Sequence, residues 1–257
     1  MKEYKQNHFA GIIPARYASS RFPGKPLALI GNRTMIQRVY EQASKALDLV
    51  YVATDDKRIY RTVLDFGGKA VMTSPDHLSG TDRIAEAVNH IFRATGKAID
   101  IVVNIQGDEP FIRPEQIILL KDCFKDDSVE IATLIRKVDK GEDIFNPNQP
   151  KVITNFKGDA IYFSRAAIPY FRDADLKEWP QKHVYFKHIG LYAYRTETLN
   201  MITKLPRSPL EIAESLEQNR WLENGYRIRT AITLWESVGI DTPEDLEKAK
   251  LLLKHFN

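Results

Sequence analysis

Two hydrophobic patterns alternate along the first half of the chain, and this alternation constrains the fold more than any other feature. Short apolar runs rich in β-branched residues predict buried strands at Phe9–Pro14, Val50–Thr54, Lys69–Thr73, Ile101–Ile105 and Ile131–Ile135. Between them, apolar residues recur at helical spacing at Met35, Ile36, Val39, Tyr40, Ala43 and Leu47, and again at Ile84, Ala85, Val88, Ile91 and Phe92. Strands that alternate with helices favour an α/β fold with a mostly parallel central sheet and helices on both faces.

The second half of the chain has a different character. The expected elements are a helix that starts at Pro114, a hairpin of Lys151–Phe156 and Ala160–Ser164, a strand at His188–Tyr194, a helix at Pro209–Asn224 with Ile212, Leu216 and Trp221 buried, a last strand at Arg227–Trp235 and a closing helix at Pro243–His255. The length fits one domain, so we interpret residues 1–257 as a single domain with an inserted β-rich subdomain at about 145–205. This insertion is expected to cap a pocket or to form a dimer interface.

The composition narrows the class of protein. The chain is 43% hydrophobic and 28% charged, as ordinary soluble globular proteins are. Its 37 basic and 34 acidic residues are interspersed, which disfavours a nucleic-acid-binding protein. No apolar run approaches the roughly 18 residues of a membrane span, and the N-terminal residues lack the apolar core of a secretory signal. Because Cys123 is the single cysteine, no disulfide can form within the chain, and a cytoplasmic location is expected.

The connection after the first predicted strand is crowded with cations and hydroxyls, namely Arg16, Ser19, Ser20, Arg21 and Lys25. Parallel sheets bind ligands beyond the carboxyl ends of their strands. Small residues let backbone N–H groups approach phosphate oxygens, which Arg and Lys neutralise. The loop is therefore either a cradle for a polyphosphate or a hydrated surface loop. It is not a P-loop, because a proline follows its Gly-Lys pair, and the Gly-x-Gly-x-x-Gly dinucleotide pattern is also absent.

Two acidic residues are candidate ligands for a metal ion. Asp108 follows the apolar strand that ends at Ile105, although an aspartate in a Gly-Asp turn is commonly just part of the turn. Asp241 precedes Thr242, the expected N-cap of the closing helix, where Asp245 completes a capping box and leaves Asp241 free for another role. Mg²⁺ is commonly held by one or two carboxylates plus substrate phosphates. Together with the cationic loop, Asp108 and Asp241 therefore predict one shared magnesium site.

Two further polar segments each have two interpretations. Asp55 and Asp56 follow the second predicted strand, and one of them is expected to cap the next helix. The segment 79–83 is a good helix start, with Ser79 or the threonine two positions later as the cap. Its exposed N–H groups and Arg83 also suit recognition of a base or a phosphate.

Eight segments together carry a recognisable pattern: IPARYASSRFPGKPL (13–27), ATDD (53–56), SGTDR (79–83), NIQGDEP (104–110), YFSRAAIP (162–169), HIGLYAYR (188–195), PLE with LEQ (209–218) and DTPEDL (241–246). In this order they resemble the 3-deoxy-D-manno-octulosonate (Kdo) cytidylyltransferases, also called CMP-Kdo synthetases. The likeness spans about residues 9–250, which makes a chance match negligible. Nothing is transferred onto the variable stretch 173–183.

This resemblance implies a Rossmann-like nucleotidyltransferase fold, a homodimer, and the reaction of CTP with Kdo to CMP-Kdo and diphosphate with Mg²⁺, a step of lipopolysaccharide synthesis. By the family's pattern, the nucleotide is held by Arg16, Ser19, Arg21, Lys25, Ser79, Arg83 and Gln106. The sugar acid is bound by Gln106, Arg165, His188, Tyr192 and Glu217, and magnesium by Asp108 and Asp241. The implied catalytic residues are Arg16, Lys25, Asp108 and Asp241.

The chemistry of this reaction agrees with these residues. The anomeric hydroxyl of Kdo attacks the α-phosphorus as diphosphate departs, so positioning and charge neutralisation dominate. Arg16 and Lys25 are expected to stabilise the leaving diphosphate. No general base is named, because a metal held by the two aspartates lowers the pKa of the hydroxyl. Arg165 suits the carboxylate of the sugar acid, its alternative being a surface arginine at a strand end.

Other interpretations stay open at this point. A cytidylyltransferase for 8-amino-Kdo fits the same segments. A sialic-type acid is disfavoured, since those synthetases carry Gly-Ser-Lys where this chain has Ala-Ser-Ser-Arg. A catalytically silent nucleotide-binding regulator is disfavoured because Lys25 and both aspartates are present. A nucleic-acid-binding module is disfavoured by the balanced charge.

Overall fold

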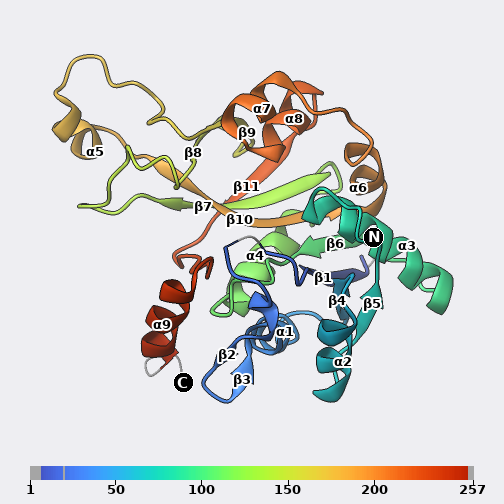
Figure 1. Cartoon of the computed structure of the whole chain (residues 1–257). Helices are drawn as coiled ribbons and strands as arrows, with labels where there is room; N and C mark the ends of the chain where they lie inside the picture. Colours follow the sequence, from blue (N-terminus) through green and yellow to red (C-terminus); the bar gives the residue numbers. More distant parts are fainter. Residues whose placement is uncertain (1–6, 20, 254–257) are drawn as a thin grey trace. The chain divides into compact units, whose positions relative to one another are not determined.

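A computed structural model describes residues 7–19 and 21–253 of the chain (Figure 1). These residues form two compact units, each assembled from separate segments of the chain. The first unit contains the residues up to 118, then 193–203 and those from 237 onward, and the second contains 119–192 and 204–236. Ser20 and His255, which the sequence analysis names, lie outside the described residues.

A parallel sheet forms the centre of the first unit. Its strands stand in the order β6-β1-β4-β5 and are β1 (Phe9–Ala15), β4 (Val50–Thr54), β5 (Ala70–Met72) and β6 (Ile101–Asn104). All three pairings are parallel. Every residue of β6 is buried, as expected of a parallel strand covered on both faces. The four strands predicted for this part of the chain are confirmed to within one residue at each end.

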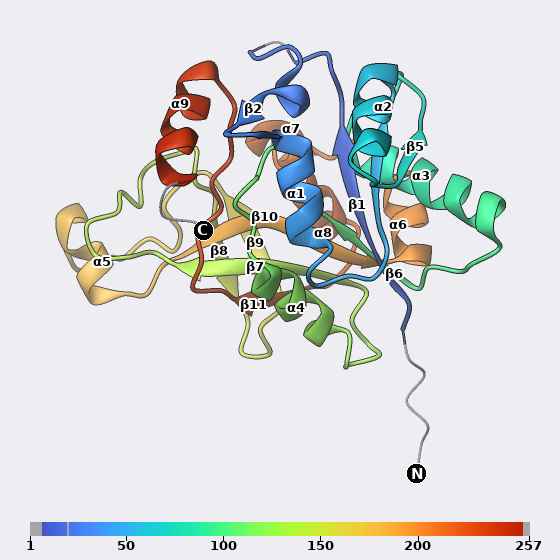
Figure 2. The same cartoon turned by 90° about the horizontal axis from the view of Figure 1, so that it is seen from below.

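Helices pack against this sheet (Figures 1 and 2). They are α1 (Met35–Ala43), α2 (Lys57–Asp65) and α3 (Gly80–Thr95). From later segments, α6 (Thr196–Ile202) contacts α3, and α9 (Pro243–Leu252) packs on the segment between β1 and α1. Between β1 and α1 the chain forms η1 (Lys25–Leu27), β2 (Leu29–Ile30) and β3 (Arg33–Thr34). The face predicted for α3 is buried except at Phe92, which is 52% exposed.

Side chains at the N-caps explain where these helices begin. Asp56, rather than Asp55, caps α2 by accepting a backbone N–H at 2.8 Å. Ser79 caps α3 in a capping box with the aspartate three positions later. Thr242 and Asp245 form the predicted capping box of α9, which is therefore confirmed.

The second unit is built from strands and short helices. The strands β7 (Ile131–Lys137) and β11 (Ile228–Ile232) pair in parallel, whereas β8 (Lys151–Thr154) pairs antiparallel with both β9 (Ala160–Ser164) and β10 (Phe186–Arg195). The helices are η2 (Leu176–Glu178), α5 (Trp179–Lys182), α7 (Pro209–Glu214) and α8 (Glu217–Glu223). By residue number α4 (Pro114–Cys123) begins in the first unit and ends in the second, and β10 runs from the second unit into the first. The predicted hairpin is confirmed.

The single helix predicted over residues 209–224 is wrong, because the chain forms two helices there. Ser215 has a φ of 51° and ends α7, a backbone conformation that residues with a Cβ atom rarely adopt. The break leaves Ile212 57% exposed instead of buried. Leu216 and Trp221 are buried as predicted.

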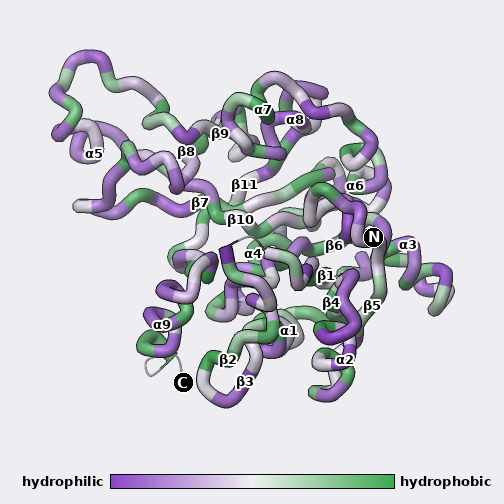
Figure 3. The backbone as a smooth tube through the Cα atoms, in the orientation of Figure 1, coloured by the Kyte–Doolittle hydropathy of each residue, from purple (hydrophilic) through white to green (hydrophobic). Residues whose placement is uncertain are grey.

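The predicted insertion at 145–205 falls mainly in the second unit, whose bounds are wider. Around α5 the chain is largely hydrophilic (Figure 3), in agreement with the polar sequence of residues 172–183. Among the described residues, no helix combines the length and apolar character needed to cross a membrane.

Candidate active site

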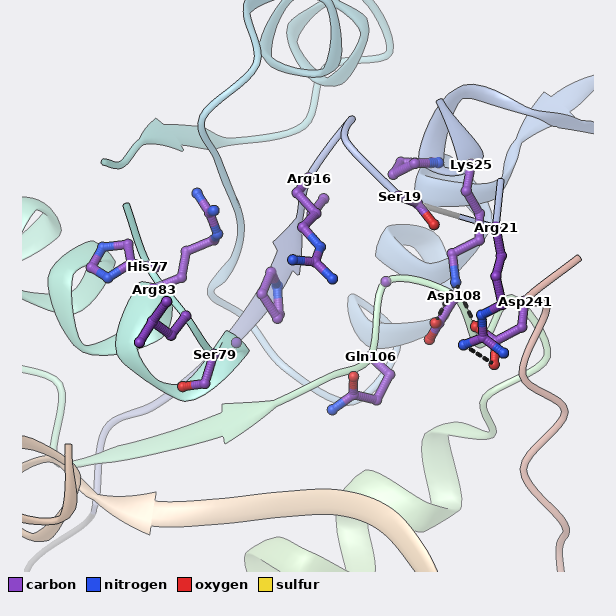
Figure 4. A pocket seen from close by; sticks show the side chains of 16 residues that line it. Arg16, Ser19, Arg21, Lys25, His77, Ser79, Arg83, Gln106, Asp108 and Asp241 are labelled. Carbon is purple, nitrogen blue, oxygen red and sulfur yellow. Dashed lines mark hydrogen bonds and ion pairs between the residues drawn. The ribbon is translucent and has the colours of Figure 1, made fainter. Parts of the chain in front are cut away.

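A pocket of about 360 Å³ opens beyond the carboxyl ends of β1 and β6 in the first unit (Figure 4). This is the edge of a parallel sheet at which ligands bind. The polar side chains that line it are Arg16, Ser19, Arg21, Lys25, His77, Ser79, Arg83, Gln106, Asp108 and Asp241. Every residue predicted to hold the nucleotide or the metal is therefore in one pocket, and His77 is the addition that the sequence analysis did not make.

The loop after β1 is shaped by its own backbone and by one aromatic ring. The carbonyl oxygen of Tyr17 accepts the N–H groups of Ser19 at 3.0 Å and Gly24 at 2.9 Å. Gly24 has a φ of 72°, and a Cβ atom there would come within 3.0 Å of the Tyr17 ring. On the ring, the guanidinium carbon of Arg58 lies 3.3 Å from the centroid, a cation–π contact. These contacts fold the loop back so that Lys25 starts η1 at the pocket.

Lys25 brings the two predicted metal ligands together. Its Nζ lies 2.7 Å from Oδ2 of Asp108 and 3.1 Å from Oδ1 of Asp241 (Figure 4). Arg21 reaches the other oxygen of Asp241 at 3.1 Å. Behind the side chains, the N–H of Ile240 donates to the carbonyl oxygen of Asp108 at 2.9 Å and ties the two segments to each other. The structure thus brings Asp108 and Asp241 to one place, and their binding of a metal ion stays a prediction.

The donor set beside Lys25 fits a hard divalent cation. Both carboxylates are partly exposed to the pocket, where phosphate oxygens and water can complete an octahedral shell. Next to them, burial raises the pKa of Glu109 to about 7. The charge of Asp108 also raises this pKa, whereas a hydrogen bond with Ser237 lowers it. Glu109 is therefore only partly ionised at neutral pH.

Arg83 reaches the pocket from α3 but is firmly held. Its buried guanidinium donates to Oγ1 of Thr73 at 2.6 Å, to the carbonyl oxygen of Ser74 at 3.2 Å and to Oδ2 of Asp55 at 2.8 Å. Asp55 therefore serves Arg83 and not a helix cap. These bonds fix the chain after β5, so part of the role of Arg83 is to shape this end of the pocket.

His77 is the residue that sequence reasoning missed. It lines the pocket near Ser79 and Arg83 (Figure 4). Its Nε2 is hydrogen-bonded to Oε2 of Glu86 on α3. The available signal was weak, since a histidine two positions before a helix cap and a glutamate in the following helix form no recognised motif.

The second unit holds the remaining predicted residues. His188 and Tyr192 lie in a row of aromatic rings, with centroids 5.1 Å apart between Phe163 and His188, 5.2 Å between His188 and Tyr192, and 5.3 Å between Tyr192 and Trp221. Burial lowers the pKa of His188 to about 3, and its Nε2 contacts Oγ1 of Thr133 at 3.0 Å. The imidazole is therefore neutral at physiological pH.

Arg165 and Glu217 lie at the break between α7 and α8. The guanidinium of Arg165 donates to the carbonyl oxygens of Glu214 at 2.6 Å, Pro147 at 2.9 Å and Ser215 at 3.4 Å. Glu217 accepts from Arg220 at 2.6 Å. Arg165 thus has a clear structural task, and its guanidinium keeps two further N–H groups for a ligand.

Known proteins are similar to this chain over nearly its whole length. A family model described as cytidylyltransferase matches residues 10–233. The 3-deoxy-manno-octulosonate cytidylyltransferases of Parabacteroides distasonis and Bacteroides thetaiotaomicron are each 57% identical to the chain, over 95% and 96% of its length and 98% of theirs. A solved structure of CMP:2-keto-3-deoxy-manno-octonic acid synthetase complexed with CTP is 43% identical, with a TM-score of 0.88 over 97% of this chain and 99% of that one. The fold class predicted from the sequence is confirmed by this match.

Proposed function

The chain belongs to the cytidylyltransferase family, and on this premise we propose that it transfers CMP from CTP to the anomeric hydroxyl of Kdo and releases diphosphate. The observation that carries the proposal is the pocket in which Arg16, Arg21 and Lys25 gather beside Asp108 and Asp241. This combination of charges suits a nucleoside triphosphate and a divalent cation. The 43% identical relative whose structure contains CTP supports cytidine as the nucleoside. The product would be Kdo activated for lipopolysaccharide synthesis.

The residues of the loop act by position and charge. Arg16 is exposed at the mouth of the pocket and Lys25 lies deeper, so a triphosphate between them is neutralised from two sides. Negative charge grows on the β-phosphate as diphosphate leaves, and cations already in place stabilise that change without reorganisation. Ser19 and the backbone N–H groups of the loop add hydrogen bonds to phosphate oxygens.

Mg²⁺ is the proposed cofactor, and Asp108 and Asp241 would hold it. Within residues 7–19 and 21–253 there is no cluster of three or more His, Cys, Asp or Glu side chains suited to a metal ion, so substrate oxygens would complete the shell. When bound, the ion would neutralise phosphate charge and lower the pKa of the attacking hydroxyl. Lys25, which contacts both aspartates, is close enough to turn to a phosphate oxygen instead.

The sugar-acid residues are proposed by family pattern and supported by their chemistry. Gln106 lines the pocket of the first unit, whereas Arg165, His188, Tyr192 and Glu217 belong to the second unit. The two remaining N–H groups of Arg165 suit a carboxylate, and the neutral His188 suits a hydroxyl. The names of the relatives favour Kdo over 8-amino-Kdo or a sialic-type acid.

A homodimer and a cytoplasmic location belong to the same proposal. The second unit exposes Tyr170 and Val184 beside an apolar pocket of about 320 Å³ lined by Val152 and Ile168, among others. An apolar surface of this kind is typical of an interface, and a second copy is the partner we propose. Burial raises the pKa of the Cys123 thiol to about 11, so this single cysteine is unreactive, as suits a reducing compartment.

Release of diphosphate tests the proposed function directly. The purified chain is incubated with Mg²⁺, CTP and Kdo, and in parallel with ATP, GTP or UTP, with 8-amino-Kdo, and without sugar. We expect release that needs both CTP and Kdo and that stops when EDTA removes the metal. Diphosphate release with another sugar acid but not with Kdo would show that the other acid is the substrate. No release with any pair of nucleotide and sugar acid would refute the proposal.

A further inference from the structure

At one end of the pocket, the carboxylate of Glu86 is hydrogen-bonded to His77, a residue that has no role in the function proposed above. His77 lines the pocket beside Ser79 and Arg83 (Figure 4), and its side chain is 20% exposed. Its Nε2 is hydrogen-bonded to Oε2 of Glu86, one turn and a half into α3. The ring is therefore reachable from the pocket and is fixed from behind.

Glu86 is an acceptor for this whole corner of the first unit. It accepts the backbone N–H of Ser74 at 2.8 Å, and its other oxygen lies 3.5 Å from Nε2 of His90. Burial raises the pKa of Glu86, but the hydrogen bonds from His77 and Ser74 outweigh burial and hold this pKa below its usual value. The carboxylate is ionised at neutral pH and can only accept hydrogen bonds.

An acceptor-only partner decides where the hydrogen of His77 is. Because the carboxylate cannot donate, Nε2 is the nitrogen that carries a hydrogen toward Glu86, and the tautomer of the uncharged ring that fits this bond has its hydrogen on Nε2. The second ring nitrogen, Nδ1, then has a lone pair in the ring plane and is an acceptor. His77 thus offers an acceptor whose orientation is set by Glu86.

The neighbouring side chains Arg83 and Ser79 are engaged with other groups of the protein. Arg83 has only donors, and its guanidinium is bound to Thr73 and Asp55. The hydroxyl oxygen of Ser79 already accepts the N–H of Asp82 at 3.1 Å. Lys25 and Arg21 lie toward the opposite end of the pocket, and Arg16 lies between them and His77 (Figure 4). A nucleotide with its phosphates near Lys25 would therefore extend its base toward His77.

We propose that His77 reads the base of the nucleotide, with its Nδ1 accepting a hydrogen bond from the exocyclic amino group of cytosine. This inference rests on the proposed use of CTP. Uracil has a carbonyl oxygen at that position, so UTP would set two acceptors against each other and leave both unsatisfied. A site that hydrogen-bonds a substrate N–H group discriminates strongly against an analogue that lacks it. His77 is then a specificity-determining residue, and Glu86 is its positioning residue.

The ratio of kcat/KM for CTP to kcat/KM for UTP tests the role of His77. It is measured with Mg²⁺ and saturating Kdo for the wild type, His77→Ala and His90→Ala. We expect the ratio to fall at least about tenfold in His77→Ala, while KM for Kdo stays as in the wild type. His90→Ala is the matched control, because His90 contacts the same glutamate but does not line the pocket. An unchanged ratio in His77→Ala would overturn the inference.

A change of substrate covers the case in which His77→Ala folds poorly. The triphosphate of pyrimidin-2-one riboside lacks the amino group of CTP and keeps the rest of the base. We expect the wild type to use it at least about tenfold less efficiently than CTP and a folded His77→Ala to show a much smaller difference. Equal use of the two nucleotides by the wild type refutes the inference even without a variant. A wild type that turns over no CTP with Kdo refutes the proposed function instead.

Discussion

Single charged side chains decide what the pocket of the first unit can bind. Lys25 is the central one, because its ammonium group contacts both Asp108 and Asp241, while Arg21 contacts Asp241 from the solvent side. Removing the ammonium group from water without a charged partner would cost free energy of folding. Each aspartate therefore has an electrostatic role in the unliganded protein as well as the proposed role in metal binding.

Neutralising Asp108 or Asp241 tests their proposed role in metal binding, when the effect is compared with that of neutralising a nearby carboxylate outside the pocket. We expect Asp108→Asn and Asp241→Asn to reduce kcat for diphosphate release by about a hundredfold or more, the scale reported for removal of one preorganised electrostatic group, and to raise the Mg²⁺ concentration needed for half-maximal rate. Glu244→Gln is the control, since Glu244 is exposed in the first turn of α9 and does not line the pocket. Near-wild-type kcat in Asp108→Asn with an intact circular dichroism spectrum would contradict the metal assignment.

The lowered pKa of His188 leads to a prediction about the stability of the fold rather than about turnover. Its pKa is lowered to about 3 in the folded chain by burial, against about 6.5 in an unfolded chain. Between these values the unfolded chain binds a proton that the folded chain does not, so stability is fully present above about pH 6.5 and falls as the pH drops toward 3. His188→Gln, which keeps a polar group near Thr133, should lose less free energy of unfolding between pH 7 and pH 5 than the wild type. Urea unfolding at both pH values measures this, and equal losses would contradict it.

Most of the pocket could be predicted from single residues, and His77 could not. The loop cations, Asp108 and Gln106 follow predicted strands, and parallel strands end at a common edge, so strand ends placed these residues together. Asp241 instead precedes the closing helix, and its pairing with Asp108 was predicted from the way Mg²⁺ binds carboxylates. The meaning of His77 depends on Glu86, which faces it only because α3 turns back along the pocket. Helical periodicity shows which side of a helix is buried but not which polar residue of that helix meets a preceding loop.

Contacts between elements hold the phosphate loop in shape. Tyr17 packs against Gly24 inside the loop, and Arg58, near the start of α2, stacks on the outer face of the same ring. Arg58 is itself anchored by Asp56, the N-cap of α2, at 2.6 Å and 3.0 Å. The start of α2 thereby supports a loop that carries four of the proposed nucleotide-binding side chains.

Removing this support should affect the nucleotide and not the sugar. We expect Arg58→Ala to raise KM for CTP by about two- to fivefold, in keeping with one exposed cation–π contact, and to leave KM for Kdo unchanged. Arg61→Ala is a matched control, because Arg61 is exposed on the same helix and does not line the pocket. An equal rise in KM for both substrates in Arg58→Ala would show a general loss of structure and contradict the supporting role.

The break between α7 and α8 shows why one element was predicted wrongly. Ile212 and Leu216 are four positions apart, which is helical spacing, and no glycine or proline stands between them. Where the helix ends, Arg165, the residue directly after β9, donates to the carbonyl groups of Glu214 and Ser215. That contact is made in the folded unit, so local sequence gave no indication of it.

For the molecule as a whole, we propose association with a second copy rather than with nucleic acid. The formal net charge is only +3. The surface proposed for the second copy is formed by exposed apolar side chains of the second unit.

The dimer can be tested by sedimentation equilibrium. We expect a mass near twice the 29.5 kDa of the chain at micromolar concentration, and a shift toward the monomer in Val184→Glu, which places a charge in the apolar pocket of the second unit. Phe156→Glu is the control, because Phe156 is fully exposed in the turn between β8 and β9 and lies outside that pocket. A wild type that sediments as a monomer would contradict the proposal.

The first unit joins the two ends of the chain, and this has a consequence for its synthesis. One apolar cluster combines Ile30, Met35 and Phe111 with Ile240, Leu246 and Ala249. Asp241 also follows Lys25 by 216 positions, although the two side chains touch. At roughly 5 to 20 residues per second, a ribosome needs about 10 to 40 seconds to pass from one to the other. During that interval the nascent chain carries an apolar surface without its cover and a phosphate loop without its second aspartate, so activity begins only when the last segment has emerged and folded back.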